Sequence, residues 1–278
     1  MIFDDTQCLL GEGPLWSPDA QALYWFDILS KSLHRKGESR KTWQFDDYVS
    51  AAGRVESGKL LIASQNALSL FDPESGGLDL VTPLEADLPG NRSNDGRADP
   101  MGGFWIGTMA IDKTKGAGSI YRYYRGELRK LFGGITITNA ICFDPDAGYA
   151  CFTDTDIGVI QKVWLDDHGW PQGEPQPHID LVEEGLNPDG AVIDAEGCLW
   201  SAQWGAGRVA RYDADGKFMD AVDLPAKQIS CPAFGGADLT TLFATSAVED
   251  LDPAPEMEGK TFAVEIGVKG QEERKVIL

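Results

Sequence analysis

A strand pattern that recurs six times limits the folds open to this chain more than any other feature. Each copy is a short apolar segment preceded by a turn rich in Pro, Asp or Gly, residues that supply the φ values tight hairpins need. Marker residues of successive copies are spaced by 37, 43, 46, 49 and 43 residues, the range of one β-propeller blade. The six segments are Leu23–Phe26, Leu60–Ala63, Phe104–Gly107, Tyr149–Phe152, Leu199–Ala202 and Leu242–Thr245.

A second strand follows each copy and alternates polar with apolar residues, as a half-exposed strand does. We therefore predict an all-β fold, in which residues 1–278 form a single six-bladed β-propeller domain with four antiparallel strands per blade. A ring must be sealed, and Ile2-Phe3 is expected to pair with the last blade near Thr261 to Ile266. The alternative, a two-sheet sandwich followed by a second domain, leaves the repeat period unexplained. The second strands are Ser32–Arg35, Leu68–Phe71, Ser119–Arg122, Val159–Lys162, Arg208–Arg211 and Phe262–Glu265.

The charge balance narrows the choice of partners. The chain has 24 basic and 44 acidic residues, a formal net charge of −20, which disfavours nucleic acid and anionic membranes as partners. Its five cysteines include no Cys-x-x-Cys pair, and the start, Met1 to Asp5, lacks the pattern of a secretion signal. We expect a cytoplasmic protein without a membrane span; its oligomeric state is not predicted.

Polar segments precede four of the predicted strands by a similar number of residues. If the first strand set lines the centre of the ring, these segments are loops that meet at one mouth of a central channel. They place Glu12, Asn94, Asn139 and Asp189 together. Carboxylate and amide oxygens suit Ca²⁺, Mg²⁺ or Mn²⁺ and tolerate Zn²⁺, which predicts one divalent metal ion. Taken singly, however, Asn-Asp-Gly and Pro-Asp-Gly are ordinary turn sequences.

The same segments resemble the regucalcin/gluconolactonase family of sugar lactonases, and the resemblance extends from Gly11 to about Gly236. It depends on the order and spacing of several weak motifs. These are Leu10–Trp16, Asn91–Asp99 followed by Gly107-Thr108-Met109, Thr138-Asn139 ahead of Asp154, and Asn187–Gly190 with Asp194–Trp200.

The resemblance implies a six-bladed propeller with one divalent metal at the mouth of its channel. It assigns Glu12, Asn139 and Asp189 as metal ligands. It also assigns Arg92, Asn94 and Asp112 to the hydroxyl groups of a sugar substrate, with Asp112 where some relatives have Glu. The chain departs from the family at Ala140, where Gly usually follows the metal-binding Asn, and this change bears on the pose of Asn139.

The predicted metal site and the resemblance together favour one function, hydrolysis of an aldonolactone to the open-chain aldonic acid. The metal would polarise the lactone carbonyl and lower the pKa of a water molecule, and Asp189 is our candidate general base. Arg92 and Asn94 would orient the ring.

Three alternatives remain at this point. A serine or cysteine nucleophile has little support, because no Gly-x-Ser-x-Gly occurs and His34, His168 and His178 lie outside the predicted mouth loops. We expect His34 to face solvent. A paraoxonase-like or phosphotriester-hydrolysing propeller is weakened by the same lack of a mouth histidine. A non-catalytic calcium-binding or protein-binding propeller would not need Arg92 beside Asn94.

Trp204 is expected to pack between blades, and Glu249 to Glu258 to form a solvated loop.

Overall fold

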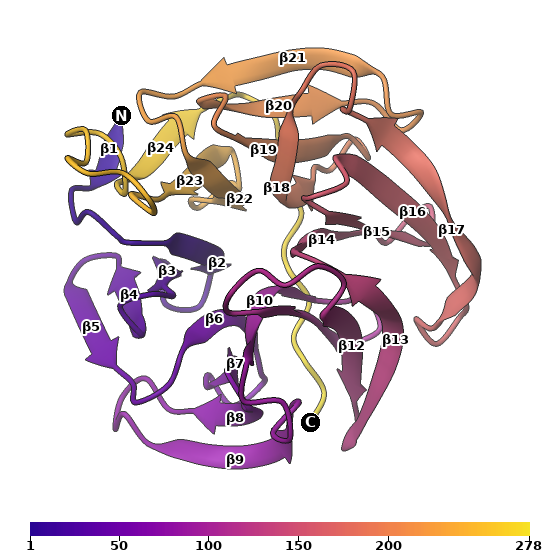
Figure 1. The fold of residues 1–278 in the computed structure, drawn as a ribbon. Helices are drawn as coiled ribbons and strands as arrows, with labels where there is room; N and C mark the ends of the chain where they lie inside the picture. The colour runs from indigo at the N-terminus through magenta and orange to yellow at the C-terminus, as the bar shows by residue number, and fades with distance from the viewer.

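Six four-stranded antiparallel sheets are arranged as blades around a common axis, as the sequence predicted (Figure 1). The computed structural model describes residues 1–278. It contains 24 strands and no helix long and apolar enough to cross a membrane. The all-β, six-bladed propeller with four strands per blade is therefore confirmed.

The first three blades follow one another along the chain, and in each the first strand lies nearest the axis and the fourth at the rim (Figure 1). Blade 1 contains β2 (Gly11–Ser17), β3 (Ala22–Asp27), β4 (Ser32–Lys36) and β5 (Arg40–Gln44). Blade 2 contains β6 (Val49–Arg54), β7 (Leu60–Ser64), β8 (Ala67–Phe71) and β9 (Leu78–Pro83). Blade 3 contains β10 (Asn91–Ala98), β11 (Phe104–Ala110), β12 (Gly118–Tyr124) and β13 (Glu127–Ile135).

Blades 4 and 5 repeat this order, whereas blade 6 combines strands from both ends of the chain. Blade 4 contains β14 (Thr138–Asp144), β15 (Tyr149–Asp154), β16 (Val159–Leu165) and β17 (Pro171–Asp180). Blade 5 contains β18 (Asn187–Ile193), β19 (Leu199–Trp204), β20 (Arg208–Tyr212) and β21 (Phe218–Asp223). Blade 6 contains β22 (Ile229–Gly235), β23 (Thr241–Ser246), β24 (Thr261–Glu265) and β1 (Ile2–Asp4).

Both predicted strand sets are strands, but their positions in the blades differ from our expectation. The first set is β3, β7, β11, β15, β19 and β23, the second strand of each blade, and not the innermost one. The second set is the third strand of each blade. The segments that we expected to be loops at the mouth belong to the innermost strands themselves.

A β-bulge explains why these innermost strands look like loops in the sequence. In every blade the pairing between the first and second strands shifts register once, for example between Glu12 and Leu15 in β2 and between Asn139 and Cys142 in β14. The other four blades show the same shift. Bulges take residues such as Gly, Asp and Asn and redirect the neighbouring side chains, which is how polar groups come to face the axis.

Hydrophobic cores lie between neighbouring blades. One cluster joins blade 1 to blade 2 through Phe26, Leu33, Ile62 and Phe71, and another joins blades 4 and 5. Burial decreases toward the rim, where strands such as β9 are mostly exposed. Every blade needs two neighbours to cover its faces, so the ring has to be complete.

The predicted seal of the ring is present. Strand β1 pairs with β24, with Ile2 opposite Phe262 and Asp4 opposite Thr261. The Phe3 ring packs edge-on against Phe243 of blade 6 at 4.9 Å and against Trp25 of blade 1 at 6.2 Å between centroids. Phe3 therefore joins the first blade to the last.

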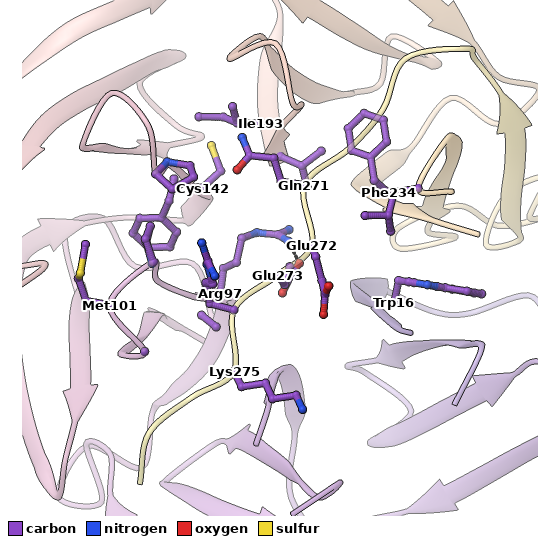
Figure 2. Close-up of a pocket in the computed structure, with 18 of the residues that line it drawn as sticks. Trp16, Arg97, Met101, Cys142, Ile193, Phe234, Gln271, Glu272, Glu273 and Lys275 are labelled. Carbon is purple, nitrogen blue, oxygen red and sulfur yellow. Dashed lines mark hydrogen bonds and ion pairs between the residues drawn. The ribbon is translucent and has the colours of Figure 1, made fainter. Parts of the chain in front are cut away.

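The segment Gly267–Leu278 runs across the middle of the ring (Figure 1). Gly270 donates a backbone hydrogen bond to Leu239 of blade 6, at 2.8 Å, and Val276 donates one to Arg54 of blade 2, at 2.7 Å. The segment lines a cavity of about 710 Å³, and its Glu273 meets the Arg97 side chain there (Figure 2). This crossing segment links blades that are not neighbours.

Replacement of Phe3 by alanine tests the seal. Because Phe3 fills a space between Trp25 and Phe243, we expect Phe3→Ala to lower the free energy of unfolding by about 2 kcal/mol. Ile2→Ala, on the exposed face of the same strand, should change it by less than about 0.5 kcal/mol. Urea unfolding measures both, and equal effects of the two variants would contradict the assigned role of Phe3.

Candidate active site

A cavity of about 170 Å³ lies at the N-terminal ends of the innermost strands, while the crossing segment lies at their C-terminal ends. The structure brings five of the six predicted site residues to this cavity. Glu12 comes from β2, Arg92 and Asn94 from β10, Asn139 from β14 and Asp189 from β18. Four blades thus contribute to one site.

The site contains two buried carboxyl groups, those of Glu12 and Asp189, whose negative charges repel each other. Burial, together with the neighbouring Asp95, raises the pKa of Glu12 to about 8. Burial also raises the pKa of Asp189 well above its usual value, and the charges of Glu12 and Asp95 add to the shift. Asp95 does not line the cavity but is buried in β10, where burial raises its pKa as well. A positive charge placed among these three carboxyl groups would therefore stabilise their ionised forms.

The orientation of the Asn139 amide is fixed by a chain of hydrogen bonds. The Thr155 hydroxyl has one proton, which it donates to the Pro188 carbonyl at 2.8 Å. Thr155 must therefore accept at its Oγ1 from Asn139 Nδ2, 2.9 Å away. Because the amide nitrogen is held there, Asn139 Oδ1 is on the opposite side of the group, where it accepts from Asn94 Nδ2 at 3.1 Å.

This donor set fits a divalent cation. Glu12 and Asp189 supply carboxylate oxygens and Asn139 supplies an amide oxygen, all at one cavity, and hard cations prefer oxygen ligands. A bound dication would also offset the repulsion between the buried carboxylates. The residues that the resemblance assigns as metal ligands are therefore compatible with a metal.

Arg92 and Asn94 form a rigid pair beside these oxygens. Arg92 Nη1 donates to Asn94 Oδ1 at 2.7 Å and to the Ser93 carbonyl at 2.9 Å. The Asn94 amide in turn donates to the Thr138 carbonyl, at 2.9 Å, as well as to Asn139. Nε and Nη2 of Arg92 make no hydrogen bond within the protein, which leaves them free for a ligand.

Asp112 is the predicted residue that the structure does not bring to the cavity. It is exposed, and its Oδ1 accepts from the backbone nitrogen and the hydroxyl of Thr114, at 3.0 and 2.7 Å. This local turn uses the carboxylate within its own loop. The next residue, Lys113, lines the cavity instead and pairs with Glu249 at 3.2 Å. A substrate contact by Asp112 stays a prediction.

Several lining residues escaped the sequence analysis. Trp204 of blade 5 packs against the hydrophobic cluster of blades 1 and 2, as expected, but it also lines the cavity. Glu249, expected in a solvated loop, lines the cavity as well, as do Lys113 and Gln228. Only Trp204 carried a usable signal. It comes two residues after the predicted strand Leu199–Ala202, and in the structure it pairs with Asn187, which begins the inner strand containing Asp189.

Histidine and serine chemistry is not available at this site. No His, Ser or Cys is among the residues that line the cavity. His34 is buried, contrary to our expectation that it faces solvent, because its ring nitrogens bond the hydroxyls of Ser32 at 3.2 Å and Thr42 at 2.9 Å within blade 1. The cavity therefore contains no Ser–His or Cys–His pair.

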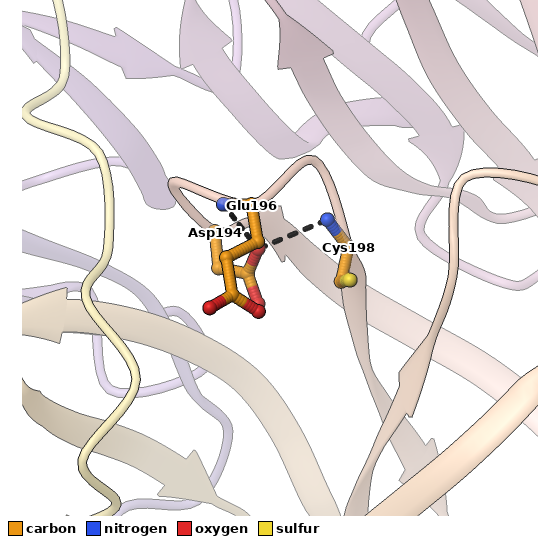
Figure 3. A group of neighbouring side chains, drawn as sticks. All are labelled: Asp194, Glu196 and Cys198. Atoms are coloured by element: carbon orange, nitrogen blue, oxygen red, sulfur yellow. Dashed lines mark hydrogen bonds between the residues drawn. The ribbon is translucent and has the colours of Figure 1, made fainter.

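A second group of acidic and thiol side chains consists of Asp194, Glu196 and Cys198 (Figure 3). Asp194 Oδ1 accepts from the backbone nitrogens of Glu196 and Cys198, both at 2.9 Å. Its Oδ2 accepts from Trp200 and Arg211, and Arg211 also pairs with Glu196 at 2.6 Å. Both carboxylates already bond Arg211, and Asp194 also bonds two backbone nitrogens and Trp200, so this group stabilises a turn.

Comparison with known proteins points to one family. Residues 10–248 match the model of the SMP-30/gluconolactonase/LRE-like region. A putative sugar lactone lactonase of Rhizobium meliloti is 41% identical, over 94% of this chain and 92% of that protein. A 6-deoxy-6-sulfogluconolactonase of Pseudomonas putida is 34% identical, over 94% and 93%. The crystal structure of a calcium-binding protein, regucalcin, from Agrobacterium tumefaciens superimposes with a TM-score of 0.96 at 42% identity, over 100% of this chain and 97% of that one.

Removal of one buried carboxylate tests the repulsion in the site. We expect Glu12→Gln to raise the unfolding temperature by a few degrees in the presence of a chelator, because it relieves the like charges at the centre. The same change should abolish any rise in unfolding temperature on addition of a divalent cation. Differential scanning fluorimetry measures both effects, with exposed Glu38→Gln as control. A Glu12→Gln protein that is still stabilised by the cation would contradict the assignment.

Proposed function

Because the chain belongs to the SMP-30/gluconolactonase/LRE-like family, we propose that it hydrolyses an aldonolactone, such as gluconolactone or xylonolactone, to the aldonic acid. The observation that carries this proposal is the single small cavity in which Glu12, Asn139 and Asp189 meet beside Arg92. Oxygen ligands for a cation, beside a guanidinium group with two nitrogens that lack a protein partner, suit a neutral, hydroxyl-rich cyclic ester. Relatives whose names describe sugar lactonases support the same substrate class.

Glu12, Asn139 and Asp189 would hold one divalent cation. The Agrobacterium neighbour is described as a calcium-binding protein, which makes Ca²⁺ the first cation to test, followed by Zn²⁺, Mn²⁺ and Mg²⁺. When bound, such an ion supplies Lewis acidity toward the lactone carbonyl and lowers the pKa of water at the site.

The protein groups then supply orientation and proton transfer. Arg92, held by Asn94, would hydrogen-bond ring hydroxyls through Nε and Nη2 and turn the carbonyl toward the cation ligands. Asp189 would accept a proton from the attacking water as the new carbon–oxygen bond forms. It would return the proton to the ring oxygen as the ester carbon–oxygen bond breaks, which leaves the open-chain acid.

A calcium-binding propeller without catalysis is the second candidate, and the description of the Agrobacterium neighbour favours it. The two candidates differ in Arg92, which pure cation binding does not require. A phosphotriester hydrolase of the histidine-dependent kind has less support, because no histidine lines the cavity.

We propose the cytoplasm as the location of the protein. All five cysteines, Cys8, Cys142, Cys151, Cys198 and Cys231, are free and buried, a state that a reducing compartment preserves. The proposed partner is a small sugar lactone, and the charge of −20 still disfavours nucleic acid and anionic membranes.

Acid release from pentono- and hexonolactones, followed in weak buffer with and without chelator, tests the activity. We expect cation-dependent hydrolysis above the spontaneous rate. Asp189→Asn should lower kcat by about 10²–10³-fold through loss of the base, with exposed Asp79→Asn as control. Near-normal activity of Asp189→Asn with the cation bound would show that Asp189 is not the base. Absence of cation-dependent hydrolysis across the panel would favour the non-catalytic candidate.

Substitution of Arg92 tests substrate orientation. Arg92→Met removes hydrogen bonds to the sugar, so KM should rise about tenfold or more, with a smaller change in kcat. Arg129→Met, at the rim of blade 3, is the matched control. Steady-state kinetics on the preferred lactone measures both constants. An unchanged KM for Arg92→Met would remove Arg92 from the substrate site.

A further inference from the structure

Ala140 adopts a backbone conformation that normally requires glycine. Its φ is +55°, in the left-handed region, and it directly follows Asn139 within the bulge of β14. The residue after Glu12 has a similar φ of +52°, but there it is Gly13. A methyl group in this region is strained, so surrounding contacts must hold Ala140 in place.

Two side chains of the neighbouring blade hold the two peptide groups that follow Ala140. Asp95 Oδ2 accepts a hydrogen bond from the Ile141 backbone nitrogen at 2.7 Å. Arg97 Nε donates one to the Ile141 carbonyl at 3.1 Å. Asp95 lies in the bulge of β10 and Arg97 lies just after it, and both side chains are directed toward Ile141 of the neighbouring blade. The Asp95 bond holds the peptide group between Ala140 and Ile141, which sets the ψ angle of Ala140. The Arg97 bond holds the following peptide group, between Ile141 and Cys142, and so fixes the next turn of the backbone in the same bulge.

Arg97 is itself held from the other side of the ring. Its Nη1 forms an ion pair with Glu273 of the crossing segment, and Figure 2 shows the two side chains meeting. Arg97 is only 7% exposed. Its guanidinium group therefore cannot move away from the Ile141 carbonyl without breaking a buried ion pair.

We propose that Asp95 and Arg97 are positioning residues that keep Ala140 in the left-handed conformation and thereby aim Asn139 at the proposed cation. Neither residue lines the site cavity, and each reaches Asn139 through its hydrogen bond to the β14 backbone. The inference rests on the proposed function, because it concerns a ligand of the cation site. It explains how this chain accommodates Ala140 at a position that suits glycine.

A positioning role and a purely electrostatic role of Arg97 predict opposite effects of its removal on the affinity for the cation. If Arg97 acted only through its charge, its removal would strengthen binding of a cation nearby. If Arg97 holds the bulge, its removal lets Ala140 relax to a negative φ, moves Asn139 and weakens binding. Outer contacts of this kind commonly change metal affinity by about 10–100-fold.

Calorimetric titration of the chelator-treated protein with Ca²⁺, and separately with Zn²⁺, Mn²⁺ and Mg²⁺, tests the inference. For the cation that the unmodified protein binds most tightly, Arg97→Met should raise Kd about tenfold or more. Adding Ala140→Gly to Arg97→Met should restore Kd to within about threefold, because glycine adopts positive φ without help. Arg54→Met is the matched control, since Arg54 also bonds the crossing segment, at the Glu272 side chain and the Glu273 carbonyl, but makes no bond to β14.

Asp95 provides a second test that does not depend on the folding of the Arg97 variant. Asp95→Asn keeps an oxygen that can accept from Ile141 and should bind nearly normally, whereas Asp95→Ala should bind weakly and be rescued by Ala140→Gly. Unchanged or tighter binding by both Arg97→Met and Asp95→Ala, or no rescue by Ala140→Gly, would overturn the positioning role. Absence of cation binding by the unmodified protein would instead overturn the proposed function itself.

Discussion

Repulsion among three buried carboxyl groups, those of Glu12, Asp95 and Asp189, is the constraint on which the centre of this molecule depends. Only a closed ring brings residues from β2, β10 and β18 to one axis, and burial there raises the pKa of each group. Arg92 and Arg97 supply compensating charge from the same strand, β10. Each is held by a bond to a neighbouring side chain, Asn94 or Glu273. The result is a rigid set of oxygens suited to a cation.

The sequence predicted the architecture because the second and third strands of each blade have simple patterns. Segments such as Leu60–Ala63 are short apolar runs between turns, and Ser32–Arg35 alternates, so periodicity identifies both. The innermost strands were mistaken for loops because their bulges contain Gly, Pro, Asp and Asn. In β10 the register shift lies between Ser93 and Gly96, where the letters alone resemble a turn. Local composition cannot distinguish a bulge in a buried strand from a loop.

Local sequence patterns also identified some residues of the site and missed others. Glu12, Arg92, Asn94, Asn139 and Asp189 lie on innermost strands with recognisable motifs, and they line the cavity together. Asp112 follows β11 and is used by its own turn. Lys113 and Glu249 reach the cavity from connections in blades 3 and 6, where no motif marks them. Asp95 and Arg97 act through hydrogen bonds to the β14 backbone, a relation between blades that no single segment of sequence displays.

The seam between β1 and β24 also constrains how the chain is made. Ile2 and Phe262 are partners across the seam, yet 260 residues separate them in the chain. At ribosomal speeds of about 5–20 residues per second, β1 waits on the order of tens of seconds for its partner strand. During that interval Phe3 has neither Phe243 nor a completed ring to cover it, and an unpaired strand edge attracts other chains. The nascent polypeptide, more than the finished ring, is then the species most exposed to aggregation.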